Sequence, residues 1–427
     1  MKTPAFIFAG ILAVASLASA IPNPAAEFCV NCGYRYEIRT DPQGGQYGVC
    51  VFPDGSECDE WAYYRKCNAP QTCGDCNPSA VSSGPNCCPW PCPKQIIYVD
   101  DDGPADFNNI QAAINDSNDG DTVVVADGIY TGLCNRDIDF QGKAITVRSE
   151  NGPENCIIDC QATGQDNHRG FYFHRAEGPD SVVDGFTITN GHFWYSGDDW
   201  TDNCGGGIQC CHASPTITRN IIRGNSVGYA GNGICCDASS AIITNNVIAG
   251  NGHYAWGSGI ACLNNSSPKI QNNIIEGNWA SNVGGVYCKD SHMTLIGNTI
   301  KGNYGDCGIG GIGCLNSSAT IMNNLIVGND SGDDFGGGIW SMDSVLDIIN
   351  CTIAGNFRDG IRASGSVSVS NCIIRGPYPI SGGLTVTYSN VEEGYEGVGN
   401  IDADPCFADG DYHLKSQAGR WDANEGR

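Results

Sequence analysis

The feature that most constrains the fold is a repeat of about 26 residues in the second half of the chain. A glycine recurs at intervals of 26, 27, 25, 26, 27 and 21 residues, at Gly224, Gly250, Gly277, Gly302, Gly328, Gly355 and Gly376. An isoleucine stands two places before each glycine, and Ile, Leu or Val stands seven places before it. A third aliphatic column opens each repeat, at Ile208, Ile234, Ile260, Val286, Ile312, Ile339 and Ile361. These stretches are short, mostly β-branched and bounded by Gly, Asn or Ser, so each predicts a strand.

Propellers, leucine-rich arrays and solenoids are all built from repeats. A propeller blade needs about 40 residues, and a leucine-rich repeat needs a helical return that this pattern lacks. The chain therefore predicts an all-β fold, a right-handed parallel β-helix (solenoid) whose coils lie about 4.8 Å apart. Apolar residues at helical spacing in 107–114 predict a short plug over the first coil, followed by a first strand at 121–126. We place the solenoid at residues 95–410 and a C-terminal tail at 411–427.

An asparagine column supports this architecture. It lies four places before the glycine column and continues as cysteine in the last two repeats, at Asn220, Asn246, Asn273, Asn298, Asn324, Cys351 and Cys372. An inward asparagine at a bend can donate to the next coil and satisfy carbonyls that the bend leaves open. We interpret these side chains as structural.

A cysteine column recurs every 26 residues, at Cys210, Cys236, Cys262, Cys288 and Cys314, and continues as Ser341 and Ala363. It could be a metal or redox stack, but a ladder of small buried side chains is the interpretation that we favour. Stacked cysteines have parallel Cβ vectors, which place their sulfurs poorly for a bridge. We predict a Cys211–Cys235 disulfide instead. With 25 cysteines in the chain, at least one thiol stays unpaired in a monomer.

Export is predicted from the first twenty residues. Lys2, an apolar run and Ala18-Ser19-Ala20 describe a signal peptide at 1–20 that is cleaved after Ala20. We therefore expect a secreted or cell-surface protein without a transmembrane segment. Ten cysteines then fall between Cys29 and Cys92, which predicts a small disulfide-rich domain at 21–76 and a Pro- and Cys-rich linker at 77–94. A zinc site built from Cys29, Cys32, Cys73 and Cys76 is the alternative that we weigh against disulfides.

The small domain resembles a known family over residues 23–67. The resemblance rests on Asn23-Pro24-Ala25, Gly44-Gly45-Gln46-Tyr47-Gly48-Val49-Cys50, Phe52-Pro53-Asp54-Gly55, Glu60-Trp61 and Tyr64-Arg65. It is similar to a bacterial secreted domain of unknown function that carries a haemolysin label and no established catalytic role. The four cysteines usual in that family look like Cys29, Cys50, Cys58 and Cys67. Cys32 and the five cysteines from Cys73 to Cys92 depart from the pattern, so the pairing stays open.

Residues 96–410 resemble the right-handed parallel β-helix superfamily of pectate-lyase-like proteins. The stretches that carry this resemblance, besides the repeat, are Asp184-Gly185-Phe186-Thr187-Ile188 and Asn400-Ile401-Asp402-Ala403-Asp404-Pro405. The resemblance implies a fold and not a reaction. The Gly-His-Gly and Arg-Ile-Lys motifs of polygalacturonases and the Tyr-Gly-Phe-Asp-Pro-His-Asp signature of alginate epimerases are absent from the sequence. We interpret Asp100-Asp101-Asp102-Gly103 as a turn, because it lacks the spacing of a calcium loop.

Aromatic residues recur in the variable segments that follow the glycine column. We predict that they form a ridge that binds sugar faces, with Trp194, Trp200, Tyr229, Tyr254, Trp256, Trp279 and Tyr304 as contacts. Packing of these rings on the flank of the coils is the alternative.

The same segments contain acids. Asp198, Asp199, Asp333 and Asp334 with Arg358 are candidate catalytic residues, because glycoside cleavage uses paired carboxylates and a lyase needs a base. Asp202, Asp306, Asp330 and Asp359 are candidate Ca²⁺ ligands. Solvated turn aspartates are an equally weighted alternative for both sets.

The formal charge of −25 excludes a nucleic-acid partner held by a basic surface. We expect a secreted β-helix protein that binds, and could also process as a lyase or glycoside hydrolase, an extracellular polysaccharide along the aromatic and acidic edge. The alternative is a non-catalytic surface or adhesin-like scaffold.

Overall fold

A computed structural model describes residues 23–31, 34–41, 44–52, 55–61, 63, 95–194, 203–253, 255–332, 336–408, 412 and 414. The chain divides into two compact units, a small one before residue 94 and a large one after it. The expected signal peptide at 1–20 and linker at 77–94 lie outside the described residues. Among the residues that the structure describes, no helix is long and apolar enough to span a bilayer.

The small unit is a helix packed on a three-stranded antiparallel sheet. It consists of α1 (Pro24–Asn31), β1 (Arg35–Thr40), β2 (Gln46–Val51) and β3 (Glu57–Asp59), in the order β1-β2-β3. A disulfide joins Cys29 to Cys50, and Cys58 is disulfide-bonded as well. The disulfide-rich domain is therefore confirmed. A zinc site that uses Cys29 is excluded, because this sulfur is already bonded.

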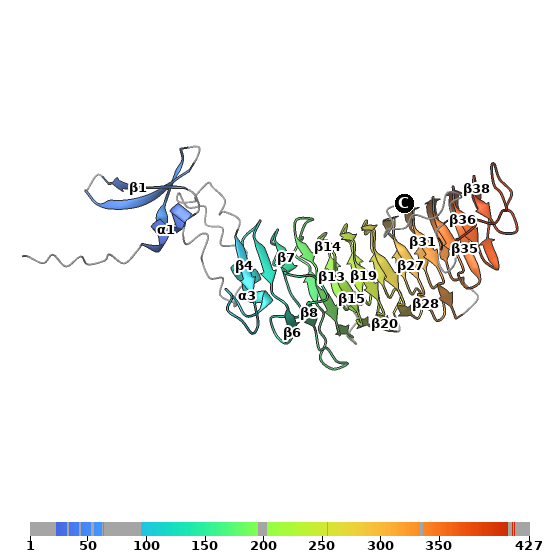
Figure 1. Ribbon diagram of the computed structural model, residues 1–427, viewed down its shortest axis with the longest axis horizontal. Coiled ribbons are helices and arrows are strands. Elements are labelled where there is room, and N and C mark those ends of the chain that lie inside the picture. The colour runs from blue at the N-terminus through green and yellow to red at the C-terminus, as the bar shows by residue number, and fades with distance from the viewer. Residues whose placement is uncertain are drawn as a thin grey trace, which may run out of the picture. The chain divides into compact units, whose positions relative to one another are not determined.

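The large unit is a parallel β-solenoid with three main faces, and its coils stack along one axis (Figure 1). Face A contains β9 (Phe171–Phe173), β13 (Ile208–Cys211), β17 (Ile234–Asp237), β21 (Ile260–Leu263), β25 (Val286–Lys289), β29 (Ile312–Leu315) and β37 (Tyr378–Ser381). Face B contains β4 (Ile96–Val99), β5 (Thr122–Val125), β7 (Thr146–Ser149), β10 (Val182–Asp184), β14 (Thr216–Thr218), β18 (Ile242–Thr244), β22 (Lys269–Gln271), β26 (His292–Ile296), β30 (Ser318–Met322) and β38 (Thr385–Thr387). Two long strands run through both faces, β33 (Ile339–Ile349) and β35 (Asp359–Ser370).

Face C completes each coil. Its strands are β6 (Gly128–Tyr130), β8 (Cys156–Asp159), β11 (Thr187–Thr189), β15 (Ile221–Arg223), β19 (Val247–Ala249), β23 (Ile274–Glu276), β27 (Thr299–Lys301), β31 (Leu325–Val327), β34 (Thr352–Ala354), β36 (Ile373–Arg375) and β39 (Asn390–Val391). Short strands also pair outside the coils, and we call this set the flank strands: β12 (His192–Phe193), β16 (Ser226–Val227), β20 (Gly252–His253), β24 (Trp279–Ala280), β28 (Tyr304–Gly305) and β32 (Asp330–Ser331).

The core is a set of in-register aliphatic ladders, as the repeat predicts. Ile234 pairs with Ile260 and Ile260 with Val286, and all three side chains are buried. The core of the first coils contains larger side chains, because Phe140, Phe171 and Phe173 pack against each other there. The predicted plug is confirmed as α3 (Ile110–Asp116), which buries Ile110, Ala113 and Ile114 against the first coil. The strand predicted at 121–126 is β5, but it is not the first strand, because β4 precedes the helix and pairs with β5.

The asparagine column is confirmed as a hydrogen-bonded ladder. In a typical step, Asn273 Oδ1 accepts from the backbone N–H and from Nδ2 of Asn246, at 2.9 and 3.0 Å. Asn273 Nδ2 donates to Ile243 O at 2.9 Å and to Asn298 Oδ1 at 3.0 Å. A second ladder, which we did not predict, uses the asparagine after the first six column glycines: Asn225, Asn251, Asn278, Asn303, Asn329 and Asn356. Both ladders satisfy backbone groups at the corners of the coils.

The cysteine column is also confirmed as a buried ladder. Cys210, Cys236, Cys262, Cys288 and Cys314 pair in register, are completely buried and form no disulfides. Burial raises the pKa of the Cys288 thiol to about 11. The predicted Cys211–Cys235 bridge is wrong, and neither sulfur is in a disulfide. The register pairs Cys211 with Asp237 and Cys235 with Gln209, so the two sulfurs do not stand opposite each other.

Candidate functional site

The outer surface of face A is the candidate functional surface of the solenoid. Side chains alternate between the two sides of a strand, so the residue between two core positions points outward. One such position lines up in register through eight coils, and we call it the outer column: Tyr172, Gln209, Cys235, Ala261, Tyr287, Gly313, Trp340 and Arg362.

Part of the outer column is covered by a second apolar cluster outside the coils. Loop residues such as Ala230, Val283 and Ile309 pack onto Cys235, Ala261 and Tyr287 of the column. Tyr229 and Trp340 pack at the edge of this cluster and are only partly buried. The loops that carry Ala230, Val283 and Ile309 are therefore anchored by their own small core, which gives the surface beside them a defined shape.

A cavity of about 200 Å³ opens next to this cluster. Its wall contains Trp256, Tyr287 and Trp340, with apolar Val283, Ile309 and Leu315 and the polar Asn282. Trp256 is stacked on Tyr287 with ring centroids 6.0 Å apart and remains 43% exposed. Tyr287 and Trp340 are separated in the outer column by Gly313. Two aromatic rings two strand spacings apart, about 10 Å, thus flank an apolar hollow that is open to solvent.

The predicted aromatic ridge is divided between two places. Trp256 lines the cavity, whereas Trp279 and Tyr304 pair in register on the flank strands β24 and β28. Trp194 is 45% exposed, and its ring lies over Gly228 of the next coil. Tyr229 is half-buried, and burial raises its pKa. Trp200 and Tyr254 lie outside the described residues.

Tyr287 and Trp340 were not among the predicted binding residues. Both stand on strands in the middle of the repeat and not in the variable segments. The only signal in the sequence was their position, because each occupies the outward place next to a column isoleucine or valine.

The predicted acids are dispersed in the described part of the chain. Asp306 accepts a 3.4 Å hydrogen bond from the Tyr304 hydroxyl, and Asp330 lies on β32 in register with Tyr304. Asp359 is buried, accepts from the Ser381 hydroxyl at 2.6 Å and lies 3.7 Å from Arg362. Asp198, Asp199, Asp202, Asp333 and Asp334 lie outside the described residues.

Arg358, the predicted base, lines a second hollow of about 630 Å³ with Asp359, Arg362 and Tyr378. Arg362 is the register neighbour of Trp340. The two hollows therefore follow one another along the outer column.

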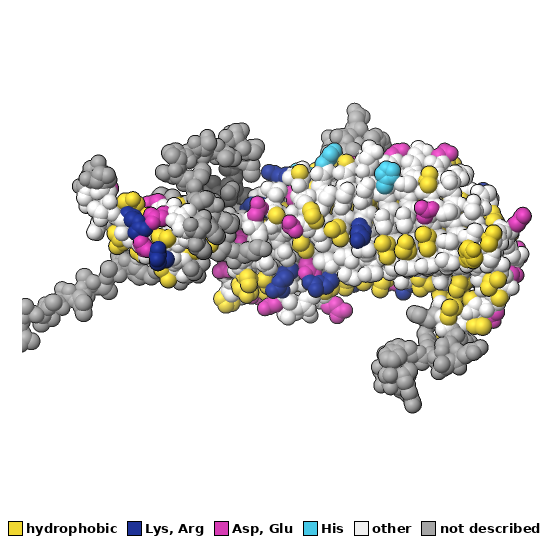
Figure 2. All heavy atoms as spheres, turned by 90° about the horizontal axis from the view of Figure 1, so that it is seen from above, with side chains coloured by type: hydrophobic (Ala, Val, Ile, Leu, Met, Phe, Trp, Pro, Cys, Tyr) yellow, Lys and Arg dark blue, Asp and Glu magenta, His cyan; other side chains and the backbone are white. Residues whose placement is uncertain are grey.

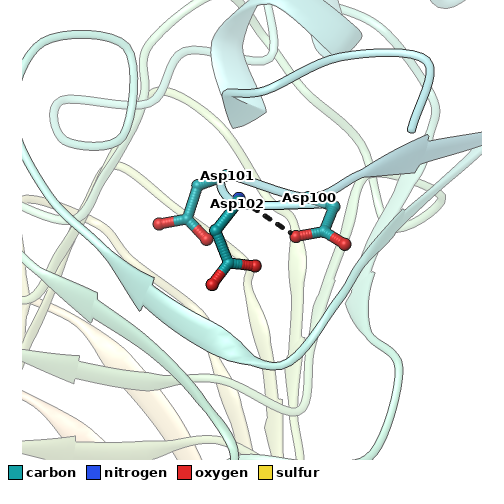
Figure 3. A group of neighbouring side chains, drawn as sticks. All are labelled: Asp100, Asp101 and Asp102. Carbon is teal, nitrogen blue, oxygen red and sulfur yellow. Dashed lines mark hydrogen bonds between the residues drawn. The ribbon is translucent and has the colours of Figure 1, made fainter. Parts of the chain in front are cut away.

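Within the described residues, one group of acids is close enough to share a metal ion, and it contains none of the predicted ligands. Asp100, Asp101 and Asp102 follow β4 (Figure 3). Asp100 Oδ1 accepts from the backbone N–H groups of Asp102 at 3.2 Å and Gly103 at 3.0 Å. This is the turn that the sequence predicts.

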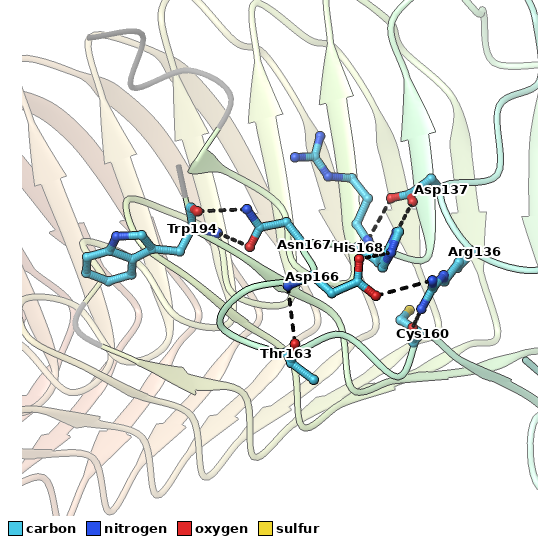
Figure 4. A network of polar contacts seen from close by, with 9 residues as sticks. Arg136, Asp137, Cys160, Thr163, Asp166, Asn167, His168 and Trp194 are labelled. Atoms are coloured by element: carbon cyan, nitrogen blue, oxygen red, sulfur yellow. Dashed lines mark hydrogen bonds and ion pairs between the residues drawn. The ribbon is translucent and has the colours of Figure 1, made fainter. Parts of the chain in front are cut away.

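A polar network that sequence reasoning missed lies near the start of the outer column (Figure 4). The His168 ring lies between the carboxylates of Asp137 and Asp166, and its Nε2 is 3.0 Å from Asp166 Oδ1. Arg136 contacts Asp166 at 3.4 Å. The Arg169 guanidinium lies over the Phe193 ring at 4.0 Å and donates to Gln209 of the outer column.

The same network holds the backbone of Trp194. Asn167 Nδ2 donates to Trp194 O at 2.7 Å, and Asn167 Oδ1 accepts from Trp194 N at 3.0 Å (Figure 4). Asn167 and Trp194 are 27 positions apart in the sequence but precede the regular repeat, so no column of recurring residues connected them.

Charge is sparse on the solenoid face seen in Figure 2, where Lys, Arg, Asp and Glu stand in ones and twos among uncharged side chains. That face offers no basic patch of the kind that phosphate recognition requires.

Two family profiles match the chain. The profile described as a right-handed β-helix region matches residues 201–345 and 258–396, and the one described as a domain of unknown function (DUF333) matches residues 20–67. The large unit is a right-handed β-helix. The DUF333 match covers the described part of the small unit. Both expected family resemblances are therefore confirmed.

Similar proteins are distant. An uncharacterised protein of Archaeoglobus fulgidus is 35% identical over 65 residues, which span 15% of this chain and 30% of the relative. Pectate lyase Pel9A has a TM-score of 0.39 at 14% identity, with 74% of this chain and 82% of that chain covered. A rhamnogalacturonan lyase has a TM-score of 0.36 at 14% identity, with 73% and 90% covered. Tailspike protein 2 of bacteriophage CAB120 has a TM-score of 0.38 at 12% identity, with 68% and 41% covered. At these values none of them assigns an activity to this chain.

Proposed function

We propose that this protein is exported and binds an extracellular polysaccharide on the outer surface of face A. The observation that carries the proposal is the hollow bounded by Trp256, Tyr287 and Trp340. Polar atoms alone do not select sugars from water, whereas an aromatic face can cover the apolar C–H surface of a pyranose ring. Asn282 in the same wall supplies an amide that can both donate to and accept from sugar hydroxyls.

The open, elongated form of the surface favours a polymer over a small ligand. The outer column continues from the aromatic hollow into the hollow of Arg358, Asp359 and Arg362. A small-molecule site is normally one enclosed cavity that buries most of its ligand. Successive hollows along a line suit successive sugar units of a chain.

Binding is measured by isothermal titration of the full chain against a panel of neutral and acidic polysaccharides, with and without calcium. We also propose that Ca²⁺ binds at Asp306, Asp330 or Asp359, which lie apart from one another. The titrations with and without calcium test this directly. Release of reducing ends is followed in the same mixtures. Unsaturated products would identify a lyase, and saturated products would identify a glycoside hydrolase.

Replacing Trp340 or Trp256 by alanine is expected to weaken binding of the retained polysaccharide about 30-fold. Loss of a buried aromatic anchor in an interface costs at least about 2 kcal/mol, which corresponds to about that factor in Kd. Tyr388→Ala is the matched control, because Tyr388 is 63% exposed on the same solenoid and lines neither hollow.

Equal affinity of the Trp340→Ala, Trp256→Ala and Tyr388→Ala variants would place any binding elsewhere on the molecule. No binding by the wild-type protein to any polymer would contradict the proposal and favour a scaffold that makes no glycan contact.

A further inference from the structure

Two cysteines outside the buried ladder meet on the outer side of face A. Cys204 lies just before β13 and is 1% exposed, and Cys235 lies on β17 and is fully buried. Both belong to the second apolar cluster. The Cys204 thiol is within hydrogen-bonding reach of the Cys235 thiol.

The geometry of this pair differs from that of the cysteine ladder. Cys210 and Cys236 are register partners, so their Cβ vectors are parallel. Cys235 is the register partner of Gln209 and Ala261, whereas Cys204 pairs with Ala230. The two side chains therefore approach each other from different backbone segments, which is how disulfide-bonded cysteines usually face one another.

A tight turn brings the two segments together. Gly231 has φ +69° and folds back over β17, where a Cβ on Gly231 would lie 2.9 Å from Cys235 Cα. Ala230, which pairs with Cys204 through a parallel β-bridge between the two backbones, precedes this glycine. The turn thus brings Ala230, and with it Cys204 of the adjacent coil, next to Cys235.

We propose that Cys204 and Cys235 form a disulfide when the chain folds in an oxidising compartment. Two S–H bonds are broken and one S–S bond is made. The two electrons reduce a disulfide-bearing oxidant such as glutathione disulfide to two thiols, which also take up the two protons. The bridge links two cysteines in adjacent coils.

The bridge has to form before the coils close. The neighbouring Cys204 thiol and burial raise the pKa of the Cys235 thiol, and only the thiolate attacks a disulfide. Once formed, the bridge holds the chain just before β13 to β17. Asn167 already holds the backbone of Trp194. The chain is then fixed at Trp194 and at Cys204, beside the outer column.

The test is a count of thiols under denaturing conditions, on full chain refolded with glutathione disulfide. In Cys204→Ser or Cys235→Ser one partner is removed and the other is released, so each variant is expected to show one more thiol than the wild type. The double variant is expected to match the wild type. The count is made in denaturant so that buried and exposed thiols are both detected.

Cys210→Ser is the internal control and is expected to show one thiol fewer, because Cys210 is not in a disulfide. If Cys204→Ser also shows one thiol fewer and the double variant two fewer, the bridge does not exist. Fragment masses that link Cys235 to any cysteine other than Cys204 would overturn the proposal as well.

Discussion

Asn273→Ala is expected to lower the free energy of unfolding by about 4 kcal/mol. The side chain makes four buried hydrogen bonds, two accepted from Asn246 and two donated to Ile243 O and Asn298 Oδ1. A buried hydrogen bond contributes about 1 kcal/mol net, and partners left without one cost more. Urea titration followed by far-ultraviolet circular dichroism measures the change.

A comparison of two replacements at Asn273 separates the loss of stability caused by lost hydrogen bonds from the loss caused by the smaller side-chain volume. Cys351 occupies the same column, accepts from Asn324 N at 3.5 Å and donates to Ile321 O at 3.4 Å. Asn273→Cys should therefore lose clearly less stability than Asn273→Ala. Lys269→Ala on the exposed side of β22 serves as the control with little expected effect. Equal losses for the cysteine and alanine variants would show that the ladder contributes through packing and not through its hydrogen bonds.

The second large effect is a fall in stability above pH 9. Burial raises the pKa of Cys210, Cys262, Cys288 and Cys314 above the ordinary value of 9.0. Between that value and the higher pKa of the folded protein, the unfolded chain loses protons that the folded chain keeps. The contribution of these protonated thiols to the free energy of unfolding is therefore complete below pH 9 and is lost as the pH rises above it. Each thiol contributes a slope of about 1.4 kcal/mol per pH unit, so four contribute roughly 5 to 6.

Urea midpoints between pH 7 and pH 11 measure this slope. The variant Cys288→Ser with Cys314→Ser is the matched comparison, because Ser341 already continues the same column. It should reduce the slope by about 3 kcal/mol per pH unit, the share of two thiols. A slope that the double variant leaves unchanged would assign the alkaline loss to other groups.

The candidate site was only partly predictable. Trp256 was found because aromatic residues interrupt the variable segments, and it lines the aromatic hollow. Tyr287 and Trp340 were missed, because an aromatic residue inside a strand is most often a core residue. Their place next to a column valine or isoleucine was the one signal in the sequence, and the register shows that both face outward. The network of Asp137, Asp166 and His168 was invisible, since no periodicity connects its members.

The chain's own sequence determined the coil. A solenoid places the same side chain over itself in each turn, so an in-register stack of isoleucine, asparagine or cysteine appears in the sequence as a period of about 26 residues. Ladders such as Asn246–Asn273–Asn298 can therefore be recognised from residue spacing alone. Contacts that do not repeat cannot: the hollow between Tyr287 and Trp340, the Asn167–Trp194 contact and the meeting of Cys204 with Cys235 depend on how flank segments fold back over a neighbouring coil. Only the tertiary structure decided these, because the residue types that meet in each contact do not recur from coil to coil.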